Sequence, residues 1–271
     1  MTAHHGDPDP RDHRSLHERI AADLRDEIMS GDLAPGAKVP STVQLKERFD
    51  ASNATIQKAL QLLKDEGLVI GRAGAAVTVR EHRQRTMRPA AYMAPAPRGE
   101  PFRWHTEATR HGGQARSTLL EVAQAVPPAD VRELLGLDDG ETAVLRRQLL
   151  TIDEEPVELV ASYYPADIAR GTPVTENRKI RGGTPTLLAD LGFPPRVSVD
   201  RVSARIPTQE QAAALRLPGN LPVLRTLRVV YSDNERPVEA TVMVKAGHLH
   251  ELQYEFTPDS PVHPGPSNRS Q

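Results

Sequence analysis

The chain has 271 residues, of which 38% are hydrophobic and 26% charged, an ordinary globular composition with room for two domains. The formal net charge of -2 means that any affinity for nucleic acid must come from a local basic surface. Cysteine is absent, which excludes disulfides, thiolate nucleophiles and zinc bound by cysteine. No long apolar run or signal peptide is recognisable, so we expect a cytoplasmic protein with no membrane partner.

The first helix is predicted over residues 15–30. Apolar residues recur there every four positions, which gives one face of an amphipathic helix. Ser15 and Glu18 have the spacing of a capping box, and Gly31 is placed to end the helix.

Two more helices and a hairpin follow. A second helix is predicted from Ser41, and a third over 53–66 with Ser52 as its N-cap. Two short β-type runs at 68–70 and 77–79 flank a glycine-containing turn. Three helices and a two-stranded wing make a winged helix-turn-helix.

Composition divides the chain into five segments. We predict a disordered tail over 1–14, the winged helix-turn-helix over 15–80, a basic proline-rich linker over 81–101, an effector-binding and dimerisation domain over 102–256, and a second disordered tail over 257–271. We interpret the linker as a solvated tether, and the alternative is that its arginines reach DNA phosphates.

The second domain mixes strands with helices, so the fold class is α+β. Strands are predicted over 117–125, 142–152, 157–164, 197–206, 223–231, 238–244 and 249–256, and helices over 128–135, 186–191 and 208–215. The loop 232–236 makes a hairpin, and the last strand is expected to close the sheet. His248 and His250, beside that strand, are expected at the surface.

The third helix is predicted to enter the major groove, because the second helix of such a pair reads base edges with its first turn. The DNA-binding candidates are Ser41, Thr42, Lys46, Arg48, Ser52, Asn53, Thr55, Gln57, Lys58 and Arg72. The amides suit adenine, and the basic side chains suit phosphates. The alternatives are a cap alone for Ser52, idle surface amides, and a solvated basic helix face.

The stretch from residue 16 to 79 also resembles a known family. It carries Asp32-Leu33-Ala34-Pro35-Gly36, then Val39-Pro40-Ser41, then Glu66-Gly67-Leu68-Val69. In order and spacing these resemble the GntR family of bacterial transcription regulators. That family often has arginine where Asn53 and Gln57 stand here, which implies a base preference shifted away from guanine, a weaker attraction to phosphates, or both.

Residues 104–256 carry Arg146-Arg147-Gln148, then Ser162-Tyr163-Tyr164-Pro165, then Arg236-Pro237-Val238-Glu239. These are similar to the effector domain of the HutC-type branch, called UTRA, which has a chorismate-lyase-like fold. The resemblance implies a pocket between the sheet and its loops, with effector-binding candidates Arg146, Arg147, Gln148, Ser162, Tyr164, Glu239 and Lys245. Relatives that bind phosphorylated sugars use arginines near Gln148 and Leu150, so these two residues argue against such a ligand.

Several of these residues have simpler interpretations. Arg146 and Arg147 point to opposite faces of a strand, so at most one enters a pocket, and both could lie on an exposed strand edge. Glu239 could form a structural salt bridge. Tyr164 could belong to the core, and Trp104 to the core or a domain interface.

The sequence therefore predicts a sequence-specific DNA-binding regulator, acting as a repressor and a homodimer, whose operator binding is modulated by a small-molecule effector. The alternative is an effector-independent repressor with a vestigial pocket. No phosphate-binding loop, nucleophile elbow or metal-ligand spacing is recognisable, so we expect no enzyme, no cofactor and no metal.

Overall fold

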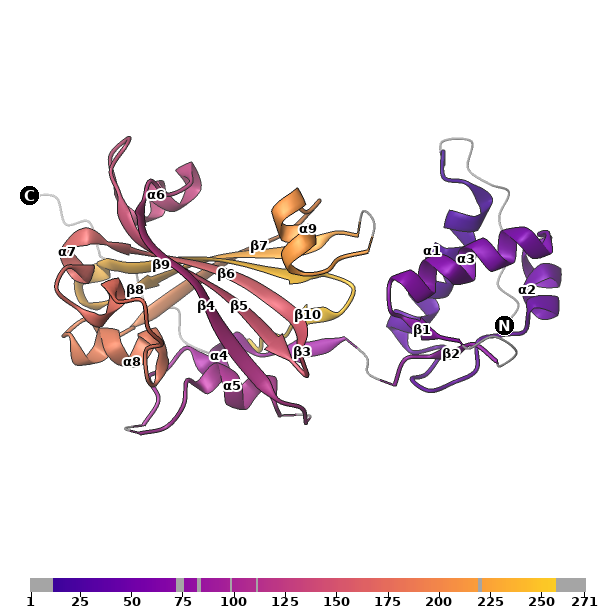
Figure 1. Ribbon diagram of the computed structural model, residues 1–271, viewed down its shortest axis with the longest axis horizontal. Coiled ribbons are helices and arrows are strands. Elements are labelled where there is room, and N and C mark those ends of the chain that lie inside the picture. Colours follow the sequence, from indigo (N-terminus) through magenta and orange to yellow (C-terminus); the bar gives the residue numbers. More distant parts are fainter. Residues whose placement is uncertain are drawn as a thin grey trace, which may run out of the picture.

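The computed structural model describes residues 12–71, 76–81, 84–97, 99–110, 112–218 and 221–256. A helical head and a larger domain built on a sheet lie at opposite ends of the molecule (Figure 1). Arg72, most of the predicted first tail and the whole of the predicted second tail lie outside the described residues. None of the described helices is both long and apolar enough to cross a membrane.

The head contains three helices and a short hairpin, as predicted. They are α1 (Leu16–Ser30), α2 (Thr42–Phe49), α3 (Asn53–Asp65), β1 (Val69–Ile70) and β2 (Thr78–Val79). Local capping sets the helix ends: the Ser15 N–H donates to Glu18 Oε2 at 2.7 Å, and Gly31 takes the left-handed conformation, φ 91°. The apolar faces of the helices meet in one core, which includes Ile20, Leu24, Leu45, Ile56 and Leu63.

The larger domain is built on an antiparallel sheet of six strands in the order β4-β5-β6-β9-β8-β7. The strands are β4 (Ala115–Ala125), β5 (Ala143–Ile152), β6 (Glu155–Pro165), β7 (Val197–Arg205), β8 (Val223–Tyr231) and β9 (Pro237–Ala246). Each falls on a predicted strand. The central strands β6 and β9 are buried along most of their length, whereas β7 is an exposed edge.

Helices cover both faces of this sheet (Figure 1). One face carries α6 (Ala129–Leu135) and α9 (Gln209–Ala214), and the other carries α4 (Pro89–Tyr92), α5 (Arg103–Ala108) and α8 (Gly183–Asp190). The short helical turns α7 (Ala166–Ala169), η1 (Pro173–Thr175) and η2 (Asp233–Glu235) lie in connections. The layer of α4 and α5 buries Tyr92 and Trp104 in an apolar cluster with sheet residues.

The interpretation of 81–101 as a solvated tether is wrong for much of its length. Residues Arg85–Met87 form β3, which pairs in parallel with β10 (His250–Leu252), and α4 follows directly. Met87 and Tyr92 are each 4% exposed. The apolar side chains in this proline-rich stretch therefore belong to the core of the larger domain.

The predicted last strand is also corrected. Only His250–Leu252 is a strand, and it pairs with β3 in a separate two-stranded sheet and does not close the large one. His248 and His250 are 6% and 5% exposed, so the expectation of surface histidines is wrong. His250 belongs to β10, which pairs with β3, whereas His248 lies where the larger domain meets the head.

Candidate nucleic-acid interface and effector cavity

The outer side of α3 presents polar side chains. Ser52, Asn53, Gln57 and Lys58 are exposed, whereas the alternate face packs Ile56 into the core. The Ser52 hydroxyl accepts the Thr55 N–H at 3.2 Å and also bonds the Thr55 hydroxyl at 2.9 Å. Ser52 and Thr55 thus form the N-cap, and the two amides and Lys58 remain accessible to a ligand.

The helix α2 is joined to α3 by a side-chain contact. Gln57 Nε2 donates to Thr42 Oγ1 at 3.3 Å, and the Ser41 hydroxyl caps α2 by accepting the Gln44 N–H. Ser41 and Thr42 therefore lie beside the first turns of α3. Val43, in the first turn of α2, is 64% exposed and adds an apolar side chain to this surface.

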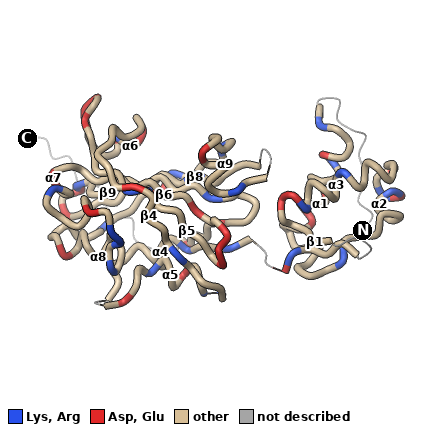
Figure 2. Tube along the Cα trace, in the orientation of Figure 1, with Lys and Arg blue, Asp and Glu red and all other residues tan. Residues whose placement is uncertain are grey.

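All three helices of the head carry basic residues, and the predicted DNA contacts among them lie on α2 and α3 (Figure 2). Lys46 and Lys58 are exposed. Arg48 forms an ion pair with Glu27 of α1 and lies over the Phe49 ring, 4.7 Å from its centroid. That ion pair raises the pKa of Arg48, chiefly through its hydrogen bond to Glu27. Lys46 and Lys58 are hence better placed for phosphates than Arg48.

Sequence reasoning missed two exposed positions of α3. Ala54 and Gln61 lie on the same side of the helix as Asn53, Gln57 and Lys58. Their helical spacing from Asn53 was the signal that could have found them. Gln61 donates to Asp65 Oδ1 at 2.7 Å, whereas the Ala54 methyl could meet the methyl group of a thymine.

A cavity of about 90 Å³ lies between the sheet and the layer of α4, α5 and α8. Its lining includes Gln148, Ser162 and Glu239, three of the predicted effector residues. The other walls are mostly apolar or aromatic, and they include Tyr92, Met93, Phe102, Trp104, Leu150, Val160 and Met243. An apolar cavity with a few convergent polar groups is typical of a small-molecule site.

Hydroxyl groups surround the Glu239 carboxylate in this cavity. Tyr164 Oη donates to Glu239 Oε1 at 2.9 Å, and Thr241 Oγ1 donates to the same oxygen at 2.8 Å. The Ser162 Oγ lies 2.8 Å from Thr241 Oγ1 and extends this hydrogen-bond network. Burial, reinforced by the charge of Glu239, raises the pKa of Tyr164, so the phenol stays protonated and donates.

Two buried ion pairs flank the network. Lys245 Nζ lies 2.8 Å from Glu158 Oε1, and both side chains are almost inaccessible. Arg228 binds both oxygens of Asp200, at 2.6 and 2.7 Å. Burial opposes the charged form of Arg228, but the interactions with Asp200 and Tyr92 together outweigh burial and raise the pKa of Arg228. Each charge at these two positions is therefore met by an opposite charge.

The arginines of β5 lie away from the cavity. Arg146 is 2% exposed and donates to the carbonyl oxygens of Val174, Glu176 and Arg178 at 2.7 to 2.8 Å. Arg147 pairs with Glu121 and Glu210 on the other face of the sheet.

An exposed strand edge is the wrong description for Arg146, because β5 is an inner strand and Arg146 is buried. Tyr164 and Lys245 are not among the residues that line the cavity. Instead, Tyr164 donates a hydrogen bond to Glu239, and Lys245 donates one to Glu158. The alternative interpretation of Glu239 as part of a structural salt bridge is also wrong, because no ion pair joins Glu239 to a described residue.

Three residues that line the cavity were not predicted from the sequence. Tyr92 and Phe102 come from or beside the stretch interpreted as a linker, and Arg228 comes from β8. Phe102 is held by Gly183, where an added Cβ would stand 2.4 Å from the ring and the φ of +80° disfavours any side chain. The apolar and aromatic residues within a proline-rich segment were the available signal.

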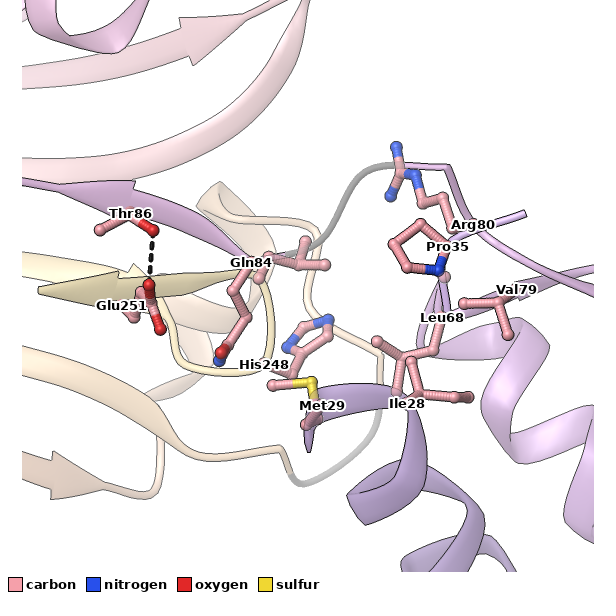
Figure 3. A pocket seen from close by; sticks show the side chains of 12 residues that line it. Ile28, Met29, Pro35, Leu68, Val79, Arg80, Gln84, Thr86, His248 and Glu251 are labelled. Carbon is pink, nitrogen blue, oxygen red and sulfur yellow. Dashed lines mark hydrogen bonds between the residues drawn. The ribbon is translucent and has the colours of Figure 1, made fainter. Parts of the chain in front are cut away.

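A second cleft, of about 200 Å³, lies where the head meets the larger domain (Figure 3). Ile28, Met29 and Leu68 of the head face Gln84 and His248 there. Next to it, Arg80 at the end of the wing binds both oxygens of Glu155, at 3.3 and 3.1 Å. Glu155 begins β6, the strand whose residues Glu158 and Ser162 line the cavity beneath α4 and α5.

A winged helix-turn-helix joined to a sheet domain with its own cavity defines a DNA-binding transcription regulator. Residues 16–79 match the family model described as bacterial regulatory proteins of the gntR family, and residues 110–251 match the UTRA domain. The chain therefore belongs to the GntR family and carries a UTRA domain.

Relatives and solved structures agree with this assignment. An uncharacterized HTH-type transcriptional regulator of Streptomyces coelicolor is 27% identical over 91% of this chain and 93% of its own length. The HTH-type transcriptional regulator GgaR of Escherichia coli is 23% identical over 85% of this chain and 87% of its own. Both relatives are named as transcriptional regulators, in agreement with the prediction that this chain is a regulator and not an enzyme.

Two crystal structures share the fold. A putative GntR-family transcriptional regulator superposes with a TM-score of 0.59 at 24% identity, covering 90% of this chain and 98% of its own. PhnF from Mycobacterium smegmatis superposes with a TM-score of 0.56 at 20% identity, covering 88% and 99%.

Proposed function

We propose that the protein is a repressor that binds operator DNA as a homodimer and is controlled by a small molecule in the cavity beneath α4 and α5. The proposal rests mainly on the observation that one strand, β6, reaches both the cavity and the DNA-binding head. Its Ser162 lines the cavity, and its Glu155 binds Arg80 at the end of the wing. Occupying a promoter blocks transcription without any further contact, so repression is the simplest output of such a DNA-binding head.

Two features support the homodimer: the short stretch of DNA that a single head can contact, and the edge strand β7. A single winged head meets few base pairs, and two half-sites give selectivity over competing DNA. The strand β7 lies at the sheet edge with Val197, Val199 and Val202 between 44% and 56% exposed. An unpaired edge with apolar side chains is suited to a second copy of the chain.

Ligand control is supported by a second contact between the domains. His248 and Glu66, the C-cap of α3, line a further cleft between the two domains, and Glu66 binds Arg25 of α1. Burial lowers the pKa of His248, with Glu66 acting in the opposite direction. A ligand that shifts β6 and β9 would therefore move the base of the reading helix, and a small rotation breaks the spacing of two half-sites.

The test is a gel shift of the full chain on its own upstream DNA, with a metabolite panel added. We expect retardation of a specific fragment and a change in retardation with one class of metabolite. No specific retardation at low salt would contradict DNA control. Specific retardation that no metabolite alters, together with no thermal shift, would favour the effector-independent repressor.

A further inference from the structure

The effector cavity contains one carboxylate that no cation neutralises. Within the described part of the chain, no lysine, arginine or histidine nitrogen lies within the 4.0 Å ion-pair distance of Glu239. Its Oε1 accepts two hydroxyl groups, whereas the contact of Oε2 with Thr184 Oγ1 is long, at 3.5 Å. Glu239 is only 7% exposed, and a buried carboxylate favours an opposite charge beside it.

The remaining charges of the cavity cancel. Arg228 is bound by Asp200, and Glu158 is bound by Lys245. These are two neutral pairs, so the wall carries the single negative charge of Glu239. An anionic ligand would meet no unpaired cation among the described lining residues, whereas a cation would meet Glu239 Oε2.

Aromatic rings make up part of the remaining wall. Tyr92, Phe102 and Trp104 line the same cavity as Glu239. The guanidinium of Arg228 already lies 5.5 Å from the centroid of the Tyr92 ring, which leaves the rings of Phe102 and Trp104 for an ammonium or guanidinium group of a ligand. The aromatic wall and the carboxylate thus favour the same charge of ligand.

From this geometry we propose that the effector is an organic cation, with an ammonium or guanidinium group that binds Glu239 among the aromatic rings. The inference rests on the proposed function and names the ligand class of that site. The volume of about 90 Å³ sets the size of the bound group. A cavity of about 150 Å³ takes benzene, so this one fits roughly four non-hydrogen atoms.

The chain provides its own reporter for a test. Trp104 is the only tryptophan and lines the cavity, so its fluorescence changes when the cavity fills. Three probes of about the same size differ in charge: isopropylammonium, isopropanol and acetate. They are titrated into the full chain at constant ionic strength.

We expect a saturable change with isopropylammonium, binding at least about ten-fold weaker for isopropanol, and no binding of acetate. Preference for acetate, equal binding of isopropanol, or no response to isopropylammonium would overturn the proposal. Because the wild-type series alone decides this, the outcome does not depend on the folding of a variant.

A pair of variants tests the assigned residue. In Glu239→Gln, isopropylammonium binding should fall to the level of isopropanol, whereas isopropanol binding stays unchanged. The control is Glu210→Gln, since Glu210 is exposed and pairs with Arg147 outside the cavity. Unaltered ammonium binding in Glu239→Gln would contradict the assignment. The gel shift without ligand tests the DNA-binding function separately, so the two failures are distinguishable.

Discussion

Gln57 combines exposure on α3 with an amide that is oriented by Thr42, at 3.3 Å from its Oγ1. An oriented amide can bond the N6 and N7 edge of adenine. We predict that Gln57→Ala weakens operator binding by about 5- to 100-fold and relaxes the base preference at one position of each half-site. Fluorescence anisotropy on the operator and its single-base variants measures this.

Lys46→Ala is the matched control for Gln57→Ala. Lys46 is exposed on α2, and a phosphate contact carries no base preference. We expect all sequences to weaken equally and the slope of log affinity against log salt to fall by about 1. Were Gln57→Ala to behave in this same uniform way, its base-reading role would be contradicted.

Arg146 has a structural role that can be separated from ligand binding. Its three hydrogen bonds hold the carbonyl oxygens of the segment around η1, and its burial lowers its pKa. We predict that Arg146→Ala lowers the free energy of unfolding by about 3 kcal/mol, because buried carbonyl groups lose their donors. Urea unfolding measures this loss. The neighbouring Arg147→Ala, on the other face, should cost at most about 1 kcal/mol.

At the scale of single elements, the pairing of β10 with β3 makes the domain sensitive to acid. Burial is the main reason that the pKa of His250 falls from its ordinary value near 6.5 to about 3. Between these values the unfolded chain binds the proton and the folded chain does not. Stability is therefore present above pH 6.5 and is lost as the pH falls toward 3, by up to about 1.4 kcal/mol per pH unit.

The variant His250→Gln tests this pH dependence. Urea unfolding between pH 7 and 5 should give a shallower slope of stability against pH than in the wild type. Some slope should remain, because burial also lowers the pKa of His248. An identical slope in both proteins would contradict the buried, neutral state of His250.

The elements of the head could be predicted because each carries its own signals. Ser15, Ser41 and Ser52 cap helices through bonds to residues three positions away, so the sequence window contains the whole interaction. The long strands of the sheet were also recognisable from their composition. By contrast, β3 and β10 have three residues each and lie more than 160 positions apart, so no local pattern indicates their pairing.

The cavity was predictable only in part, for the same physical reason. Gln148, Ser162 and Glu239 were named from the resemblance, and they form the floor on three strands of one sheet. The roof depends on how α4 and α5 pack, which a proline-rich composition conceals. Arg146 lies on a predicted strand and Lys245 directly follows one, but neither lines the cavity. Their side chains bind the carbonyl oxygen of Val174 and the carboxylate of Glu158, partners that no local pattern indicates.

At the scale of the whole molecule, Arg80 and Glu155 connect the wing to β6. Both are about one third exposed, so the ion pair adds little to stability. We predict that Arg80→Ala leaves ligand-free DNA affinity within about two-fold but reduces the change in affinity caused by the effector. A gel shift with and without effector measures both quantities.

Arg132→Ala is the control for Arg80→Ala, because it removes a surface ion pair with Asp139 inside the larger domain. Its effector response should equal that of the wild type. If Arg80→Ala also retained the full response, coupling through the wing and β6 would be contradicted.

The most direct measurement of the central claim is selection of bound duplexes from a random DNA library by the full chain, followed by footprinting. We expect an enriched sequence with two-fold symmetry, two half-sites one or more helical turns apart, and adenine among the contacted bases. Gln57→Ala should lose that enrichment. A wild-type protein that enriches no sequence, or that enriches single half-sites without symmetry, would contradict the account.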